Sequence, residues 1–519
     1  MKYPNLIHRV AGWLVAVVLV LLANRARGFS LLGPPAPWML SSNNVIEPGD
    51  IGGPMDIGSG YRWNVPVVTY GFDQSFLDYF GSNGVAAVEG AIKIINDLPP
   101  ASQLNLADYP DDTTFYDYPA LAQSLMDLKS QTLALLLEQL GLANSVRYTF
   151  VLKQWTDAFD PNNYFIAGTY SPQYIWPDWV YPDYLARLNF DPVTFVPSSY
   201  VDGTLYAAFI DIFKNTNFME VHSVDPLSDG FVAVTAGSLS TGGFYRGLSY
   251  DDVGGLAYLF STNTINYEQV LPGISGVGPN TNSWVNGAWR PGIDKISFIR
   301  QATNPISGGF LAMTNCYADT YMTNGFMVHQ QLQRIVCQPD FLFSVKDVFD
   351  GTYNSSSLQF DRTSTTNWIN NASLNSNLTG EGPGVIVPPI KITFGKTGFQ
   401  FNSGGIIEEA IYGYPFGAQN SLGSFDGTTN RPVVYPVTQT GTHQMITRMW
   451  LTLGNAPSQI QHCFTWSPTT NYGAVFQFQT STNFLNWVPL FPVTNDGTIT
   501  TYYVTQPASA RRFYRMIPK

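Results

Sequence analysis

The sequence predicts an α+β N-terminal domain followed by an all-β region that ends in a β-sandwich. Apolar residues recur at helical spacing over residues 84–98 and 119–140, and segments rich in β-branched and aromatic residues lie on either side of them. Beyond residue 385, strand-like segments continue to the last residue and no helix signal interrupts them.

The composition along the chain sets the predicted boundaries. Gly, Pro and Asn dominate residues 271–291, and residues 351–382 are polar and poor in hydrophobic residues, which is typical of linkers. The chain then divides into a signal peptide (1–28), an α+β domain (29–268), a linker with a small β-rich unit (269–350), a polar linker (351–384) and one or more β-sandwich modules (385–519).

The N-terminus has the layout of a secretory signal peptide. Lys2 and Arg9 make its start basic, residues 11–23 are an uninterrupted apolar run, and small residues stand at the last and third-last positions before Phe29. This run of 13 residues is shorter than the roughly 18 that a membrane-spanning helix needs. We therefore expect a secreted or cell-surface protein whose mature chain has no transmembrane anchor.

The charge of the chain argues against a nucleic-acid partner. The formal net charge is −11, and removing residues 1–28 takes away four basic residues and no acid, which leaves −15. Nucleic acid repels such a protein, and no basic patch with interleaved aromatic residues offsets the repulsion. Only 12% of the residues are charged while 45% are hydrophobic, a composition that favours a β-rich extracellular protein.

The first domain opens with a strand and a helix. Residues 62–73 have the β-branched and aromatic content of a strand, and residues 84–98 place apolar side chains at helical spacing. Pro99 and Pro100 stop this helix, because proline lacks the N–H group that the next turn needs.

A second helix is expected from Pro119 to Leu140. Asp117 is a suitable N-terminal cap, proline is tolerated in the first turn, and Gly141 is a natural left-handed terminator. Leucines cover so much of this segment that almost no polar face remains. We therefore expect a helix that is buried on most sides.

A hairpin and a third helix follow in this domain. Residues 201–204, Val-Asp-Gly-Thr, are a strong hairpin signal between two strand-like segments. Residues 247–260 are expected to form a helix that Ser249 caps. Asp251 and Asp252 lie in its first turn, where acidic groups interact favourably with the helix dipole.

The second helix resembles the zinc-binding helix of the metzincin metallopeptidases, whose pattern is H-E-x-x-H-x-x-G-x-x-H. With Gly141 on the family's glycine, the three ligand histidines fall on Ala134, Glu138 and Asn144, and the catalytic glutamate falls on Leu135. The resemblance therefore implies a degenerate scaffold that lacks the zinc motif.

Two other segments resemble the matrixin branch of the metzincins. Residues 63–72 match its W-x-x-P-x-x-x-Y-x-F opening strand, and residues 248–256 match the L-S-x-D-D-[IV]-x-G-[IL] of its last helix. A matrixin domain inserts several strands between the first helix and the zinc helix, whereas only residues 99–118 intervene here.

The C-terminal stretch resembles an immunoglobulin or fibronectin type III-like module of secreted bacterial proteins. In that pattern Y-x-x-x-x-S-T-N-x-x-x-W-x-x-L precedes a final R-F-Y-R strand, and Phe476 stands here in place of the tyrosine. The resemblance implies that Trp466 and Trp487 anchor a core that Phe478 and Tyr514 face.

A segment crowded with aromatic residues and prolines, residues 164–190, is the candidate binding surface. Trp176, Trp179 and Tyr181 are suited to stacking on an extracellular glycan or docking on a cell-surface protein. The alternative is that the segment folds onto its own domain as a plug, since aromatic side chains are usually buried when they can be.

Two small sets of side chains leave further alternatives open. His222 lies near Glu220 and Asp225 and is either part of a metal site or an ordinary surface histidine, since the set fits no known ligand spacing. Cys316 and Cys337 flank a predicted hairpin and are candidates for a disulfide after export.

These observations predict a secreted, non-catalytic binding or structural protein on a degenerate metallopeptidase-like domain. We assign no catalytic residue, no metal ligand and no cofactor, because neither H-E-x-x-H nor any other catalytic motif is recognisable. The alternative is an exported metallopeptidase-like hydrolase with a non-standard metal site, such as His222 with its neighbouring acids.

Overall fold

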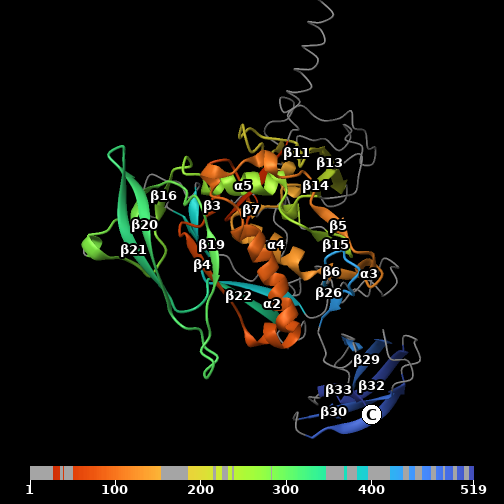
Figure 1. Cartoon of the computed structure of the whole chain (residues 1–519). Helices are drawn as coiled ribbons and strands as arrows, with labels where there is room; N and C mark the ends of the chain where they lie inside the picture. Colours follow the sequence, from red (N-terminus) through yellow and green to blue (C-terminus); the bar gives the residue numbers. More distant parts are fainter. Residues whose placement is uncertain are drawn as a thin grey trace, which may run out of the picture.

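A computed structural model describes residues 27–35, 39, 51–152, 185–213, 218–224, 232–236, 239–281, 283–346, 367–370, 383–395, 421–435, 443–449, 459–468, 475–482, 486–494, 500–507 and 513–518. Over these residues the chain is a mixed α/β protein, mostly strands with few helices, in which the strands form several small sheets (Figure 1). None of the helices described is long and apolar enough to cross a membrane.

A four-stranded parallel sheet lies in the main hydrophobic core. Its strands, in spatial order, are β19 (Ser297–Arg300), β4 (Val67–Phe72), β22 (Phe341–Lys346) and β25 (Ile390–Gly395). Only β4 lies within the predicted α+β domain, so hydrogen bonding crosses the boundaries predicted at residues 268, 350 and 384. The division into domains itself stays a prediction.

Helix α2 (Gln74–Asn96) follows β4 and packs on this sheet. The ring centroid of Phe76 lies 4.9 Å from that of Phe72 and 6.2 Å from that of Phe343. The predicted start at residue 84 is wrong, because the helix begins at Gln74. A kink at Gly81, whose φ of 59° interrupts the helical spacing, separates this first part from the predicted part.

The single helix predicted over residues 119–140 is also wrong. Helix α3 (Tyr118–Leu121) is short, strand β6 (Leu125–Asp127) follows it, and helix α4 (Leu128–Gln139) begins only after that strand. Two helices and a strand therefore replace one helix.

The interruption has a backbone cause and a long-range cause. Ser124 has a positive φ of 52°, which a continuing helix does not allow. Strand β6 pairs in parallel with β26 (Ser421–Ser424), far along the chain. The carboxylates of Asp117 and Asp127 then cap α3 and α4 separately.

Helix α4 is buried on most sides, as predicted from its leucines. Gly141, just beyond its end, has a φ of 107°, which confirms the expected positive-φ terminator. A Cβ atom at this position would lie 2.1 Å from the carbonyl oxygen of Tyr61, so only glycine fits.

The predicted hairpin and third helix are confirmed. Strands β11 (Tyr200–Val201) and β12 (Thr204–Leu205) pair around Asp202 and Gly203, whose φ values are 45° and 80°. Helix α5 (Tyr250–Phe260) begins with a capping box that Ser249 and Asp252 form.

Strand β1 (Phe29–Gly33) lies inside an antiparallel sheet rather than at its edge. It pairs with β10 (Asn189–Phe190), β2 (Gly53–Met55) and β7 (Leu142–Ala143). All five of its residues are buried. The segment that follows the predicted cleavage point is therefore an integral part of the fold.

A five-stranded antiparallel sheet lies on one side of the molecule, at the left of Figure 1. Its strands, in spatial order, are β16 (Asn266–Gln269), β18 (Gly287–Arg290), β20 (Met313–Thr323), β21 (Phe326–Val336) and β17 (Ile274–Gly276). The hairpin predicted between Cys316 and Cys337 is confirmed as β20 and β21, which form the long central hairpin of this sheet.

Smaller sheets complete the part of the chain before residue 440. They are β23 (Asn367–Asn370) with β24 (Gly384–Val387) and β3 (Tyr61–Arg62), β5 (Thr114–Tyr116) with β15 (Gly243–Tyr245), β8 (Val151–Leu152) with β9 (Leu185–Ala186), β13 (Ala207–Phe213) with β14 (Phe218–Val224), and β6 with β26 and β27 (Val433–Val434).

The C-terminal strands form two antiparallel sheets, drawn in dark blue in Figure 1. One contains β28 (His443–Met449), β29 (Gln459–Pro468) and β32 (Thr500–Pro507), and the other β31 (Val488–Thr494), β30 (Val475–Ser481) and β33 (Phe513–Pro518).

Aromatic side chains of the second of these sheets are partly arranged as the sequence implied. Phe476 and Phe478 are buried, and Phe478 stacks on Tyr514 with ring centroids 5.8 Å apart. Trp487 is only half-buried and lies under the guanidinium of Arg515 at 4.2 Å, so it is not a fully buried anchor.

Candidate functional site

The residues predicted to bind a partner cannot be placed. Trp176, Trp179 and Tyr181 lie outside the described residues. His222 lies on β14 opposite Phe209, and its side chain is not among those that the structure describes. Both the aromatic segment and the histidine set stay predictions.

The four positions that align with the zinc motif lie on α4 and just beyond it. Ala134 and Leu135 are 6% and 2% exposed and belong to the main hydrophobic core. The amide of Asn144 donates to the carbonyl of Ala236 at 3.0 Å and accepts a backbone N–H at 2.9 Å, and Glu138 is half-buried. Among the described residues, no three His, Cys, Asp or Glu side chains are grouped to hold a metal ion.

Three buried aspartates meet where α5 begins. The Asp251 carboxylate accepts hydrogen bonds from the backbone N–H groups of Gly28, at 2.8 Å, and of Asp202. The N–H of Asp251 donates in return to Asp202 at 3.1 Å, and Asp252 accepts from the Ser249 hydroxyl at 2.7 Å. This aspartate cluster, residues 202, 251 and 252, joins the start of β1, the β11–β12 turn and α5.

Burial dominates the electrostatics of the aspartate cluster. It raises the pKa of Asp251 to about 8, although hydrogen bonds from Asp202 and Gly28 act in the opposite direction. Burial, and then the charges of Asp251 and Asp252, hold the pKa of Asp202 well above its ordinary value. The raised pKa values favour bound protons in this cluster. Among the described residues these aspartates are not grouped to hold a metal ion.

The inner face of the five-stranded sheet carries all the formally charged residues of its five strands. These four residues, Glu268, Arg290, Asp319 and Arg334, are all buried. Arg290 pairs with Asp319 at 2.9 Å, and Glu268 pairs with Arg62 of β3 at 2.7 Å. Arg334 pairs with Asp340, just before β22. The first pair joins two neighbouring strands, β18 and β20, and the other two attach the sheet to the rest of the fold.

The outer face of the same sheet carries no formal charge on any strand residue. Because successive strand residues point to opposite faces, the residues that alternate with the buried ones point outward. These outward residues are Tyr267, Gln269, Ser275, Gly287, Trp289, Thr314, Cys316, Ala318, Thr320, Met322, Met327, His329, Gln331, Gln333 and Ile335. We call this surface the outer face.

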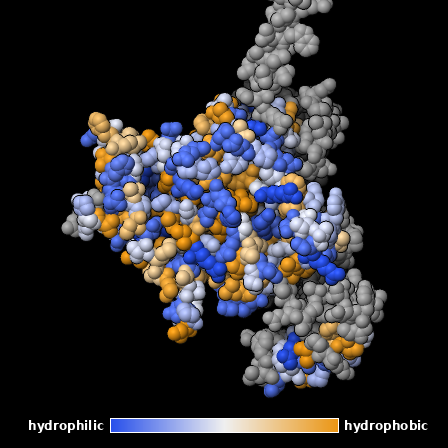
Figure 2. Space-filling model, viewed as in Figure 1, coloured by the Kyte–Doolittle hydropathy of each residue, from blue (hydrophilic) through white to orange (hydrophobic). Residues whose placement is uncertain are grey.

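The outer face changes along the β20–β21 hairpin from an apolar, aromatic end to a polar stretch. At the end near the turn, Trp289 lies opposite Met322, which lies opposite Met327. Trp289 is 50% exposed and its ring is 5.7 Å from that of Tyr267 in an edge-on arrangement. Figure 2 shows hydrophobic residues at the surface near the turn of the β20–β21 hairpin, at its upper left.

Beyond this aromatic end the outer face becomes polar. Thr320 and His329 are hydrogen-bonded across the strands at 2.9 Å. The pairs Ala318 with Gln331 and Cys316 with Gln333 follow in register. The centre of the face therefore consists of small, hydroxyl and amide side chains.

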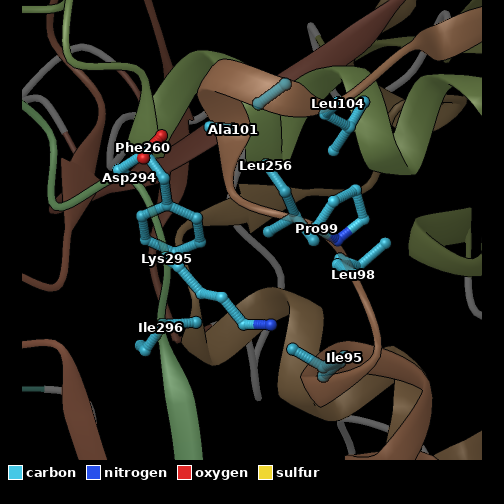
Figure 3. Close-up of a pocket in the computed structure, with 11 residues that line it drawn as sticks. Ile95, Leu98, Pro99, Ala101, Leu104, Leu256, Phe260, Asp294, Lys295 and Ile296 are labelled. Atoms are coloured by element: carbon cyan, nitrogen blue, oxygen red, sulfur yellow. The ribbon is translucent and has the colours of Figure 1, made fainter.

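A small apolar pocket lies elsewhere, between the end of α2 and α5 (Figure 3). Lys295 reaches across it toward Ile95, beside the ring of Phe260. The cavity measures about 20 Å³, which accommodates roughly one water molecule. It is too small to hold a substrate, so we regard it as a packing defect beside α5.

Cys316 and Cys337 are both free and exposed. Cys316 lies opposite Gln333, four residues before Cys337 on an extended chain, which separates the two cysteines by roughly 13 Å along the strand. A disulfide needs Cα atoms about 4.4–6.8 Å apart, so these two cysteines do not pair with each other in this fold.

The outer face is not recognisable from the sequence alone. The only signal was the strand alternation itself, because residues 266–269 and 287–290 each carry one charged residue, Glu268 or Arg290, next to an uncharged aromatic one, Tyr267 or Trp289. Alternation alone does not say which set is buried, and charged residues are usually the exposed set. Here the charged set is buried because partners such as Arg62 and Asp340 come from other strands and loops.

Comparisons with known proteins add no relative to this picture. No family model, no curated protein and no solved structure matches the chain. The outer face and the buried clusters must therefore be interpreted from their own chemistry.

Proposed function

We propose that this chain is an exported, non-catalytic binding protein that recognises its partner with the outer face. The observation that carries the proposal is the distribution of charge in the five-stranded sheet. All four formally charged strand residues lie on the buried face, and the exposed face presents Trp289, half-exposed, above a row of polar side chains. Exposed aromatic groups on an uncharged surface are typical of recognition sites.

The scaffold and location are part of the same proposal. The buried helix α4, the positive-φ Gly141 and the capped α5 support a degenerate matrixin-like scaffold. The order of the parallel sheet differs from that pattern, because the neighbours of β4 come from beyond residue 296. We further propose that the C-terminal strands form a fibronectin type III-like module and that the protein acts outside the cell.

The helix that resembles a zinc helix supports a role in packing. Leu135, at the position of the family's general base, is a core residue and offers no group that accepts a proton. The alternative, an exported hydrolase with a non-standard metal site at His222, is the second candidate because His222 and Glu220 both lie on β14.

Metal content and peptidase activity of the purified mature protein distinguish the two candidates. We expect no stoichiometric zinc and no cleavage of fluorescent casein, with or without a chelator. Glu138→Ala is the matched control and should leave both readouts unchanged. Stoichiometric zinc together with chelator-sensitive cleavage would establish the hydrolase instead.

A further inference from the structure

We infer that the outer face binds an uncharged polysaccharide chain that lies along the β20–β21 hairpin. This inference rests on the proposed binding function and names the chemical class of the partner. It follows from the charge, the hydrogen-bonding groups and the shape of the outer face, each of which excludes a different class of ligand.

The charge of the face excludes charged ligands. None of its strand residues is an Asp, Glu, Lys or Arg, while the whole chain carries −11. An anionic polymer would find no cation on this face and would be repelled by the rest of the protein. A cationic ligand would find no carboxylate to pair with. An uncharged ligand is the electrostatic complement of this surface.

The side chains of the polar strip match the hydroxyl groups of a sugar. Thr320, Gln331 and Gln333 each carry a group that both donates and accepts hydrogen bonds. Sugar hydroxyls also do both, so each of these side chains can pair with them in either sense. From Met322 to Cys316 the strip extends over seven residues of β20, which is roughly 20 Å. This length suits several linked sugars rather than a single one.

The aromatic end supplies a stacking platform at one end of the strip. The Trp289 indole is 50% exposed, and Tyr267 supports it at 5.7 Å. A flat aromatic ring is a good surface for the apolar C–H face of a pyranose. We place one sugar on Trp289 and the following sugars along Thr320, Gln331 and Gln333.

The layout of the face disfavours a protein partner or a second copy of this chain. Protein interfaces have an apolar core surrounded by a polar rim, and their dominant contacts are Trp, Tyr and Arg near the centre. Here the centre holds Ala318, Gln331 and Gln333, and the large apolar groups lie at the two ends, with Trp289 near the hairpin turn and Ile335 at the other end. The outer face also lacks arginine entirely.

Affinity electrophoresis of the full mature chain in gels that contain soluble neutral polysaccharides tests the inference. The panel is a β-glucan, a xylan, a mannan and a galactan, with anionic pectin as the charged comparison. We expect retardation by at least one neutral polysaccharide and none by pectin. We expect Trp289→Ala to weaken that binding at least tenfold, and Gln331→Leu to weaken it about threefold or more.

Tyr118→Ala is the matched control, because Tyr118 is 75% exposed but lies on α3, away from the outer face. It should bind like the unmodified protein. Ala318→Arg adds a bulky cation to the centre of the strip without touching the aromatic end, so it tests the inference even if Trp289→Ala does not fold. We expect it also to weaken binding at least tenfold.

Several results would overturn the inference. One such result is no retardation by any neutral polysaccharide, and another is retardation by pectin alone. A third is that Trp289→Ala and Ala318→Arg bind as tightly as the unmodified protein. The last is a dimer that Trp289→Ala converts into a monomer. The last result would assign the outer face to a second copy. Zinc-dependent cleavage of casein would overturn the proposed function while leaving the polysaccharide result intact, so the two failures are distinguishable.

Discussion

Two groups of charged side chains are buried in this chain, and they are arranged in opposite ways. On the inner face of the five-stranded sheet the buried acids face arginines, as Asp319 faces Arg290 at 2.9 Å. In the aspartate cluster like charges meet, and the nearby Arg27 pairs with Asp111 at 2.7 Å instead. Buried opposite charges stabilise each other at every ordinary pH, whereas buried like charges repel each other unless they bind protons. The two groups should therefore respond to different changes.

The largest effect is expected from removing one member of a buried pair. Asp319→Ala leaves the guanidinium of Arg290 buried without its carboxylate. We expect the free energy of unfolding in urea to fall by about 3–5 kcal/mol. A loss below about 1 kcal/mol would show that backbone pairing, and not the ion pair, holds β18 and β20 together.

A smaller, pH-dependent effect is expected in the aspartate cluster. The pKa of Asp251 is about 8 in the folded chain and near 3.8 in an unfolded one. Between these values the native state holds a proton that the unfolded state has lost, so the free energy of unfolding falls as the pH rises from about 4 to about 8. Stability is therefore greatest on the acid side of this window.

Asp251→Asn tests this dependence, because asparagine is neutral at every pH and keeps an oxygen that accepts the N–H of Gly28. We expect the variant to be more stable than the unmodified chain at pH 8 by about 1–3 kcal/mol, with little difference at pH 5. Thermal unfolding between pH 5 and pH 9 measures it. An unchanged slope would assign the pH dependence to other groups.

The smallest effect is expected on the outer face. Thr314→Ala alters an exposed residue of β20 that lies opposite Ile335, and it should change the free energy of unfolding by no more than about 0.5 kcal/mol. Urea unfolding beside Asp319→Ala gives a direct contrast between the two faces. A loss comparable to that of Asp319→Ala would mean that the outer face is held for stability rather than for binding.

Local chemistry made part of the fold predictable. The β11–β12 hairpin follows from Asp202 and Gly203, and α5 follows from its capping box, because each is decided by residues within one turn. The break between α3 and α4 was not predictable, since β6 needs β26 as its partner. The parallel sheet was missed for the same reason, because the partners of β4 come from distant segments.

The candidate site was less predictable than the fold. Trp289 is one of many aromatic residues, and nothing near it in the sequence marks it as exposed. Its orientation follows from the neighbouring Arg290, which turns inward to meet Asp319 on another strand. Which face of this strand points outward is therefore decided by ion pairs that form only in the folded chain.

The position of β1 also limits when the predicted leader could be removed. Gly28 is buried, and a Cβ atom there would lie 2.1 Å from the side-chain amide of Asn189, so the peptide bond between Gly28 and Phe29 is enclosed in the folded protein. A protease that cuts before Phe29 must act before β1 enters its sheet. The predicted leader must therefore be removed before the chain folds, and a chain that folds first keeps its leader.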